Sequence, residues 1–289
     1  MKTGFRLAAI ALLCFSFVAS GQQIKYYGTD DKETLKEVAS YYVSFARQGD
    51  CLYVFETRKS TNDRLLMKGY CLTPDSQSTT GHFTAYSESG GILEEGKYLN
   101  NQRTGVWKEY TDSGMLKEEG PYVDGKQKGL WNYYYDNSKR LWYTVDMVAD
   151  VQDGTLKSYY KNGKLKRVEQ LEKGKSISGK CYDQDGKEIK FTPFTQMPSP
   201  EYSIMQFLAD HIGYPSKARK KGIEGRVRVK FVVNEEGYLT QFKIIKSLGH
   251  GCDEEVLRVM RLMPKWVPGL RDDEPVKVYY TQPVSFKLE

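Results

Sequence analysis

The middle of this 289-residue chain repeats itself with a period of 24 or 25 residues. Most units begin with a glycine, carry a large apolar residue or a cysteine two positions later, and continue through a tyrosine, a turn glycine and a leucine or isoleucine. A fixed period of this length is typical of repeat architectures, in which each unit buries its apolar side against the next. The opening glycines are Gly81, Gly105, Gly129, Gly154 and Gly179, and the residues two positions later are Phe83, Trp107, Trp131, Leu156 and Cys181.

Each repeat unit is predicted to be a β-hairpin. Clusters of Asp, Asn, Ser and Gly about every ten to twelve residues leave too little uninterrupted sequence for helices. A single hairpin is marginally stable in water, so consecutive units must stack to bury their rings. The pattern resembles the MORN-type repeat, and residues 81–190 are expected to form a MORN-like spacer or scaffold. The 22 tyrosines of the chain are interpreted as stacking core in preference to a sugar- or peptide-binding face.

The region before the array, residues 22–80, admits two interpretations. Residues 66–70 resemble the end of a degraded repeat, which is expected to cap the array. Residues 30–47 place apolar side chains at helix-like steps, which fits a helix. Residues 41–45 fit equally well a strand that pairs with residues 52–55. The sequence leaves the choice between helix and strand open.

Residues 191–289 are predicted to form a small α+β domain. Three prolines within eight residues mark the passage from the repeats, at Pro193, Pro198 and Pro200. Short helices are expected at residues 203–211 and 216–221. Alternating apolar and basic residues over 226–233 predict a half-buried strand, followed by a turn at 234–237 and a returning strand at 239–247.

The last predicted elements are a helix and an edge strand. Asp253 is expected to cap the helix, whose apolar face covers the sheet, and Pro264 ends it. Trp266 is expected to fill the gap between helix and sheet. Residues 276–288 are predicted to form the final strand. Pro283 places that strand at a sheet edge, where backbone groups are open to a second chain, because proline cannot donate to ladders on both sides.

The order of these motifs, from Tyr214-Pro215 to the final strand, resembles the C-terminal domain of the TonB family over residues 192–289. The fold class is therefore expected to be mixed: an all-β hairpin repeat array, then an α+β domain with a three-stranded antiparallel sheet and two helices. The resemblance implies that a segment of an outer-membrane TonB-dependent transporter adds to the final strand by β-augmentation. The implied partner-binding residues are Tyr214, Pro215, Val276, Lys277, Val278, Tyr279, Tyr280 and Thr281.

Two functional hypotheses follow from the resemblance. In the first, a TonB-like protein docks to a transporter and couples it to inner-membrane motor proteins. In the second, the chain is a periplasmic or surface scaffold of protein-interaction modules without energy transduction. A glycan-binding repeat array is a third, more remote hypothesis. The short hydrophobic segment near Met1 and the lack of a long proline-rich arm depart from the pattern of a force-transmitting family member.

Residues 1–21 have the order of a secretory signal. Lys2 and Arg6 precede an apolar run over residues 7–19, and small residues follow. Thirteen helical residues reach roughly 20 Å, less than a bilayer core of about 30 Å. Cleavage after Gly21 and a retained short anchor are the two alternatives, and lipidation of Cys14 is less favoured because Leu12-Leu13 precedes it. The chain is expected in the cell envelope, in the periplasm with or without an inner-membrane anchor.

The charge of the chain does not predict nucleic-acid binding. Cleavage of the signal segment would remove Lys2 and Arg6 and lower the net charge from +6 to about +4. The remaining charge is spread over a chain in which 28% of the residues are charged. A mild, dispersed excess is typical of a solvated surface.

The cysteines are assigned structural roles. An oxidising compartment permits a Cys51–Cys71 disulfide, which would join the ends of a hairpin. Cys181 occupies a position that neighbouring repeats give to a large apolar residue, so it is interpreted as a buried hydrophobe. Cys252 precedes a helix and is expected to be a free thiol.

No enzyme, metal or cofactor is predicted. The three histidines, His82, His211 and His250, have no metal-ligand partner at helical or hairpin spacing. The cluster of His250, Cys252 and Asp253 is interpreted as a glycine turn leading into a helix, because residues of a nucleophilic site are rarely so close in sequence. No phosphate loop and no dinucleotide fingerprint is present.

Overall fold

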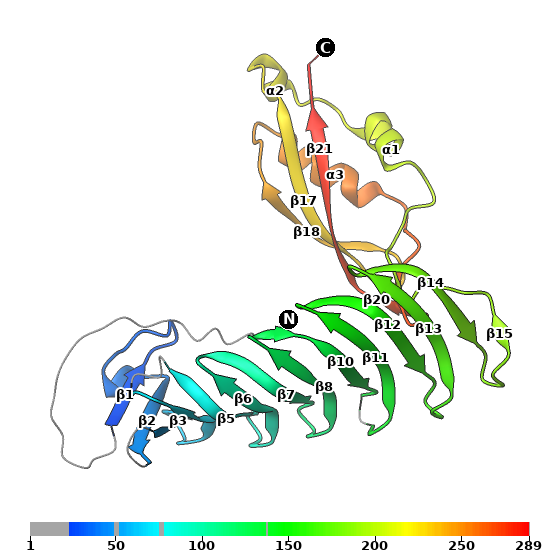
Figure 1. Ribbon diagram of the computed structural model, residues 1–289. Helices are drawn as coiled ribbons and strands as arrows, with labels where there is room; N and C mark the ends of the chain where they lie inside the picture. The colour runs from blue at the N-terminus through cyan, green and yellow to red at the C-terminus, as the bar shows by residue number, and fades with distance from the viewer. Residues whose placement is uncertain (1–22, 49–51, 75–77, 137, 289) are drawn as a thin grey trace. The chain divides into compact units, whose positions relative to one another are not determined.

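The computed structural model describes residues 23–48, 52–74, 78–136 and 138–288. The chain divides into two compact units between Lys190 and Phe191 (Figure 1). The predicted signal segment, residues 1–21, and Cys51 lie outside the described residues. The proposed Cys51–Cys71 disulfide therefore stays a prediction.

The first unit is one 15-stranded sheet in which strands close in the chain are antiparallel neighbours (Figure 1). This arrangement confirms the predicted succession of β-hairpins. The strands are β1 (Gln23–Tyr27), β2 (Tyr41–Arg47), β3 (Tyr53–Lys59), β4 (Leu65–Cys71), β5 (Thr79–Tyr86), β6 (Ile92–Leu99), β7 (Gln102–Tyr110), β8 (Leu116–Val123), β9 (Lys126–Gln127), β10 (Gly129–Tyr134), β11 (Leu141–Val148), β12 (Val151–Tyr159), β13 (Leu165–Glu172), β14 (Lys175–Tyr182) and β15 (Glu188–Ile189).

The N-terminal part of this unit is β-structure, so of the two alternatives for residues 30–47 the strand is the one that forms. Only the short 3-10 helix η1 (Lys36–Val38) forms there. The strand β2 pairs with β3 over seven positions and buries Val43 and Phe45. Runs of Tyr, Val and Phe favour strands because their side chains pack on a pleated surface. The degraded copy lies in β4, and the sheet continues past it to β1, so it does not cap the array.

Tryptophan side chains connect successive hairpins. The indole Nε1 of Trp107 donates to the carbonyl oxygen of Lys97 at 3.0 Å, and that of Trp131 donates to the carbonyl oxygen of Pro121 at 3.2 Å. Tyr98 packs edge-on against Trp107, with ring centroids 5.0 Å apart. These rings are buried or half-buried between repeats, as expected for a stacking core. Cys181 is also buried, as predicted.

The second unit contains two three-stranded sheets, ordered β18-β17-β21 and β16-β19-β20, and three helices among its described residues. The predicted antiparallel sheet is the first of these. The second sheet was not predicted. The three helices lie where the sequence pattern placed them, one more than the two given in the expected fold class. The elements are β16 (Thr195–Gln196), α1 (Ile204–His211), α2 (Ser216–Lys220), β17 (Gly225–Val233), β18 (Leu239–Lys246), α3 (Cys252–Leu262), β19 (Gly269–Arg271), β20 (Glu274–Val276) and β21 (Val278–Phe286).

The predicted final strand is two strands. Residue Val276 belongs to β20, where it pairs with Gly269 in the smaller sheet, and β21 starts at Val278. Asp272 and Asp273 both adopt positive φ, 52° and 69°, between β19 and β20. Positive φ at both central residues is typical of a tight hairpin turn, which the sequence pattern did not indicate.

One face of the main sheet is covered by α3 (Figure 1). Val227, Val229 and Phe231 on β17 are fully buried in the same cluster as Val256 and Val259 on α3. Trp266 is also buried, and it lies edge-on to Phe231 at a centroid distance of 5.7 Å, in the gap where the sequence placed it.

The predicted helix cap is wrong. Gly251 is the N-cap of α3 and has a φ of 89°. Asp253 lies inside the first turn, and its carboxylate accepts hydrogen bonds from the Leu248 amide and the Ser247 hydroxyl instead. The carboxylate therefore links Ser247 and Leu248, just after β18, to the first turn of α3 by hydrogen bonds.

Candidate partner-binding site

The strand β21 forms a regular edge of the main sheet. It pairs with β17 over nine positions, from Gly225 opposite Phe286 to Val233 opposite Val278, with no register shift. Among the described residues, no strand pairs with the other side of β21. Every second residue of such a strand turns its amide and carbonyl groups to the open side.

Pro283 fixes which residues face outward. It lies opposite Arg228 without disturbing the ladder, which fits a proline nitrogen on the open side, where no ladder bond is lost. Because outward-facing groups alternate along a strand, Tyr279 and Thr281 then present both an N–H and a C=O to a second chain. Pro283 presents only its carbonyl, so the open donors are interrupted there.

The opposite edge of the sheet, β18, is irregular. Its pairing with β17 contains two register shifts, and Gln241 has a φ of 54°. Bulges of this kind twist a strand and interrupt its row of backbone groups, which makes it a poor template for another chain. Within the main sheet, β21 is therefore the edge suited to strand addition.

Side chains on β21 alternate between the core and solvent. Tyr280 packs edge-on against Trp266 with a centroid distance of 5.2 Å. Tyr279 is 63% exposed, and the Lys230 ammonium lies 4.9 Å from the centroid of its ring. The alternation over residues 226–233 predicts that Lys230 lies on the outer face. It does not indicate the contact with Tyr279, because that contact depends on the register between β17 and β21.

The predicted partner-binding residues fall into two groups. Val278, Tyr279, Tyr280 and Thr281 form the first half of β21, and Lys277 precedes it. The ammonium of Lys277 lies 3.8 Å from the Glu235 carboxylate.

The other group lies near the opposite end of β21. The ring of Tyr214 packs edge-on against Phe286 at 5.6 Å, its hydroxyl donates to the Ile223 carbonyl, and Pro215 is the N-cap of α2. Five residues separate Thr281 from Phe286, roughly 17 Å of extended strand. The structure therefore does not bring Tyr214 and Pro215 together with residues 278–281.

His250, Cys252 and Asp253 are not arranged as a nucleophilic site. Cys252 is a free, fully buried thiol at the start of α3. Burial raises the pKa of this thiol, whereas a reactive cysteine needs a lowered pKa. In the described part of the chain, no group of three His, Cys, Asp or Glu side chains could hold a metal ion.

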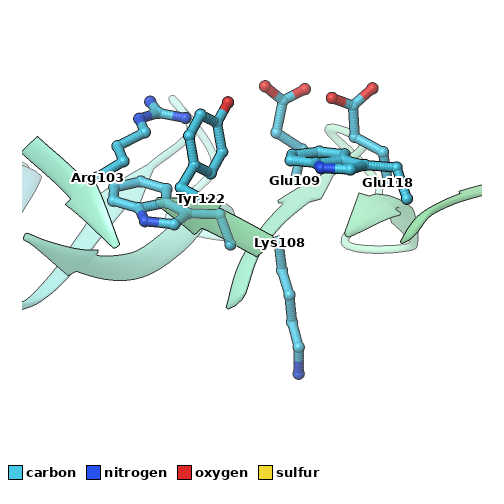
Figure 2. Close-up of a pocket in the computed structure, with 7 residues that line it drawn as sticks. Arg103, Lys108, Glu109, Glu118 and Tyr122 are labelled. Atoms are coloured by element: carbon cyan, nitrogen blue, oxygen red, sulfur yellow. The ribbon is translucent and has the colours of Figure 1, made fainter. Parts of the chain in front are cut away.

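The repeat sheet carries a small pocket lined by residues of neighbouring strands. Figure 2 shows Arg103, Tyr122, Glu109 and Glu118 pointing to one side of the sheet and Lys108 pointing to the other. The Arg103 guanidinium lies 2.7 Å from Glu94 and 3.9 Å from the Trp107 ring centroid. These groups hold one another, and glycan binding there stays a prediction.

Family models match a part of each unit. Residues 210–288 match the family described as the C-terminal region of the Gram-negative bacterial TonB protein. Residues 103–124 and 152–172 match the MORN repeat variant. The second unit contains a TonB C-terminal domain. The resemblances found in the sequence are thus confirmed for both parts of the chain.

Two curated relatives and a solved structure are similar to parts of this chain. The chain is 39% identical over 57 residues to Protein TonB of Helicobacter pylori strains J99 and 26695, which covers 18% of this chain and 20% of each relative. The solution structure of the Helicobacter pylori TonB C-terminal domain is 28% identical and covers 29% of this chain and 88% of that one, with a TM-score of 0.22. The chain thus spans about a fifth of the length of the curated relatives it matches.

None of the helices in the described ranges has both the length and the apolar character to cross a bilayer.

Proposed function

We propose that the TonB domain of this protein docks to an outer-membrane transporter by strand addition at the open edge of β21. The observation that carries the proposal is the contrast between the two edges of the main sheet. β21 pairs with β17 through nine uninterrupted positions, whereas β18 carries two register shifts. Family membership supports a transporter segment as the added strand.

The edge geometry limits how tightly a partner is held. Between Tyr279 and Pro283 the edge offers two donors and three acceptors, so a strand docked on this stretch gains about five ladder bonds. At about 1 kcal/mol each, these bonds contribute on the order of 5 kcal/mol before the cost of association. That free energy corresponds to weak, sub-millimolar binding. Docking is therefore transient unless side chains of the partner add to it.

The same proposal includes a location and a role for the whole chain. The protein is exported to the periplasm, and the sheet of repeats, which precedes the TonB domain in the chain, serves as a spacer or scaffold. Energy transduction requires that residues 1–21 remain as an inner-membrane anchor that meets motor proteins. A chain that starts at Gln22 in soluble extract would instead favour a scaffold without energy transduction. Sequencing the N-terminus of the native protein separates these two versions.

The docking proposal is tested by removing one outward N–H from β21. Thr281→Pro removes the donor and leaves the side that pairs with β17 intact, as Pro283 already does, whereas Thr281→Ala keeps the donor. Pull-down from outer-membrane extracts of the producing bacterium, read by mass spectrometry, should recover a transporter with the wild type and Thr281→Ala. Recovery should be lost with Thr281→Pro. Equal recovery by both variants, with unchanged circular dichroism, rules out docking by strand addition at this edge.

A further inference from the structure

The outer face of the main sheet carries five exposed cations in register. On β17, Arg226, Arg228 and Lys230 alternate with the buried core residues. On β18, Lys246 lies opposite Arg228 and Lys243 lies opposite Lys230. Residues directly opposite each other on neighbouring strands are roughly 5 Å apart. The five cations therefore form one continuous basic face on the side of the sheet away from α3.

The chain itself does not neutralise this face. In the described ranges, no carboxylate forms an ion pair with any of the five cations. The β21 residues opposite Arg226, Arg228 and Lys230 are Ser285, Pro283 and Thr281, which are uncharged.

In the repeat sheet, by contrast, arginines form ion pairs with glutamates. There, Arg58 pairs with Glu56 and Arg103 with Glu94. Like charges directly opposite each other on adjacent strands destabilise a sheet. The facing cations on the TonB domain therefore lower its folding stability. Binding of an external anion would offset this repulsion.

The spread of the cations and the exposed residues next to them indicate which kind of anion fits this face. The cations lie on two adjacent strands of a sheet, so their charges spread over a broad surface and do not converge on one point. Tyr279 and Ile245 are exposed beside them, at 63% and 50%. A tyrosine ring with a polar tip is suited to the headgroup region of a bilayer. Long Lys and Arg side chains can keep their charges at the level of lipid phosphates while their stems cover apolar surface.

We propose that this basic face binds the phosphate headgroups of an anionic membrane surface. Lys217 and Lys220 of α2 and its C-cap residue Lys221 are further exposed cations, close in the chain to the start of β17. Strand addition at β21 would extend the sheet in its own plane and leave this face open. Membrane contact and transporter docking can therefore occur together, and neither requires the other.

The test compares vesicle binding by variants of the chain from Gln22 onward, which retains every described residue and lacks the apolar N-terminal run. Co-sedimentation is measured with phosphatidylglycerol–phosphatidylcholine vesicles and with pure phosphatidylcholine vesicles. Each Lys or Arg near an anionic surface is worth about fivefold in partitioning. Arg228→Gln with Lys246→Gln should therefore lower partitioning onto the anionic vesicles roughly 25-fold, and the wild type should bind pure phosphatidylcholine weakly.

A matched control removes the same charge from the other side of the domain. Arg261→Gln with Lys265→Gln alters two exposed cations, one in the last turn of α3, which covers the opposite face, and one three residues beyond that helix. This variant should keep wild-type partitioning. An equal loss in both variants would show that net charge alone governs binding and would overturn the proposal.

Two further readouts complete the test. The Arg228→Gln, Lys246→Gln variant should melt at or above the wild-type temperature because it loses a like-charge pair, so its weaker binding would not come from unfolding. A poly-glutamate peptide is the probe for an acidic protein partner. Binding of that peptide by the wild type, with no binding to anionic vesicles, would overturn the membrane proposal in favour of an acidic protein.

Discussion

The indole of Trp107 lies directly over Gly96 of the preceding strand. A Cβ atom added to Gly96 would be 2.2 Å from Cδ2 of the ring, and one added to Gly120 would be 2.3 Å from the same atom of Trp131. Each tryptophan also donates to a carbonyl one residue after its glycine. The glycine and the tryptophan of successive hairpins therefore form one unit, and this pairing explains why both recur with the same period.

Gly96→Ala should destabilise the repeat sheet by about 1–3 kcal/mol, because the methyl group forces the indole or the backbone to move. Urea denaturation followed by tryptophan fluorescence measures this change. Gly91→Ala is the matched control, since its Cβ would meet Ser87 Oγ at 3.5 Å and Ser89 Oγ at 3.9 Å, both at ordinary contact distance. The control should change the free energy of unfolding by less than about 0.5 kcal/mol. Equal effects of the two substitutions would contradict the pairing of Gly96 with Trp107.

Tyr110 and Tyr134 should make the repeat sheet sensitive to alkali. Their hydroxyls donate to Glu95 and Glu119, each at 2.7 Å, and partial burial together with these bonds raises the pKa of each tyrosine to about 12. An unfolded tyrosine has a pKa of about 10. The stabilisation is therefore complete below pH 10 and is lost as the pH rises toward 12.

The check for this prediction is the urea midpoint between pH 9 and about 12. Replacing both residues, Tyr110→Phe with Tyr134→Phe, should flatten the alkaline decline and lower stability at pH 7. A decline as steep as that of the wild type would show that other groups cause it.

Pro283→Thr should make the open edge of β21 more prone to pairing. The substitution restores an outward N–H next to Thr281 and lengthens the continuous row of donors, which favours association of two copies. Sedimentation velocity over a concentration series should show self-association, and Ser285→Thr, which adds no donor, should stay as the wild type. A more stable variant that does not self-associate would mean that residue 283 faces β17.

Glu255 should contribute an acid-sensitive part of the stability of the TonB domain. Its carboxylate accepts from the Gly213 amide at 2.7 Å and pairs with Arg258, and the Arg258 hydrogen bond lowers the pKa of Glu255. This contribution is present above the unfolded glutamate pKa of about 4.3 and is lost as the pH falls through the lower folded pKa.

Glu255→Gln is the substitution that isolates this charge. It keeps an oxygen acceptor for Gly213 and should cost about 1 kcal/mol or less at pH 7, because Arg258 is half exposed. Near pH 2, thermal melting should no longer distinguish the variant from the wild type. A constant difference across the whole pH range would exclude the charge as its cause.

Both units of the fold were largely predictable because their signals are local. The period of the glycines, the alternation through β17 and the apolar face of α3 each follow from the geometry of one element. Residues 30–47 stayed open between helix and strand because helical spacing and strand-forming side chains compete there. Pairing of β2 with β3 decided between them.

The candidate site was predictable only in part. Pro283 correctly placed the final strand at a sheet edge. Because of the tight turn at Asp272 and Asp273, Val276 pairs in the smaller sheet and not in the main one. Tyr214 packs on Phe286, at the end of β21 far from Thr281. Neither effect has a signal in the side-chain pattern, because each depends on which strand pairs with which.

By itself, the sequence determined the repeat period, the β-hairpin units, the TonB-like order of elements and the edge position imposed by Pro283. Each of these depends on the conformational limits of single residues or on periodicity within one element. Only the tertiary structure decided that β18 is bulged while β21 is regular, and that the cations of β17 and β18 lie opposite one another. Those features depend on strand register, which is set by contacts between segments that are separate in the chain.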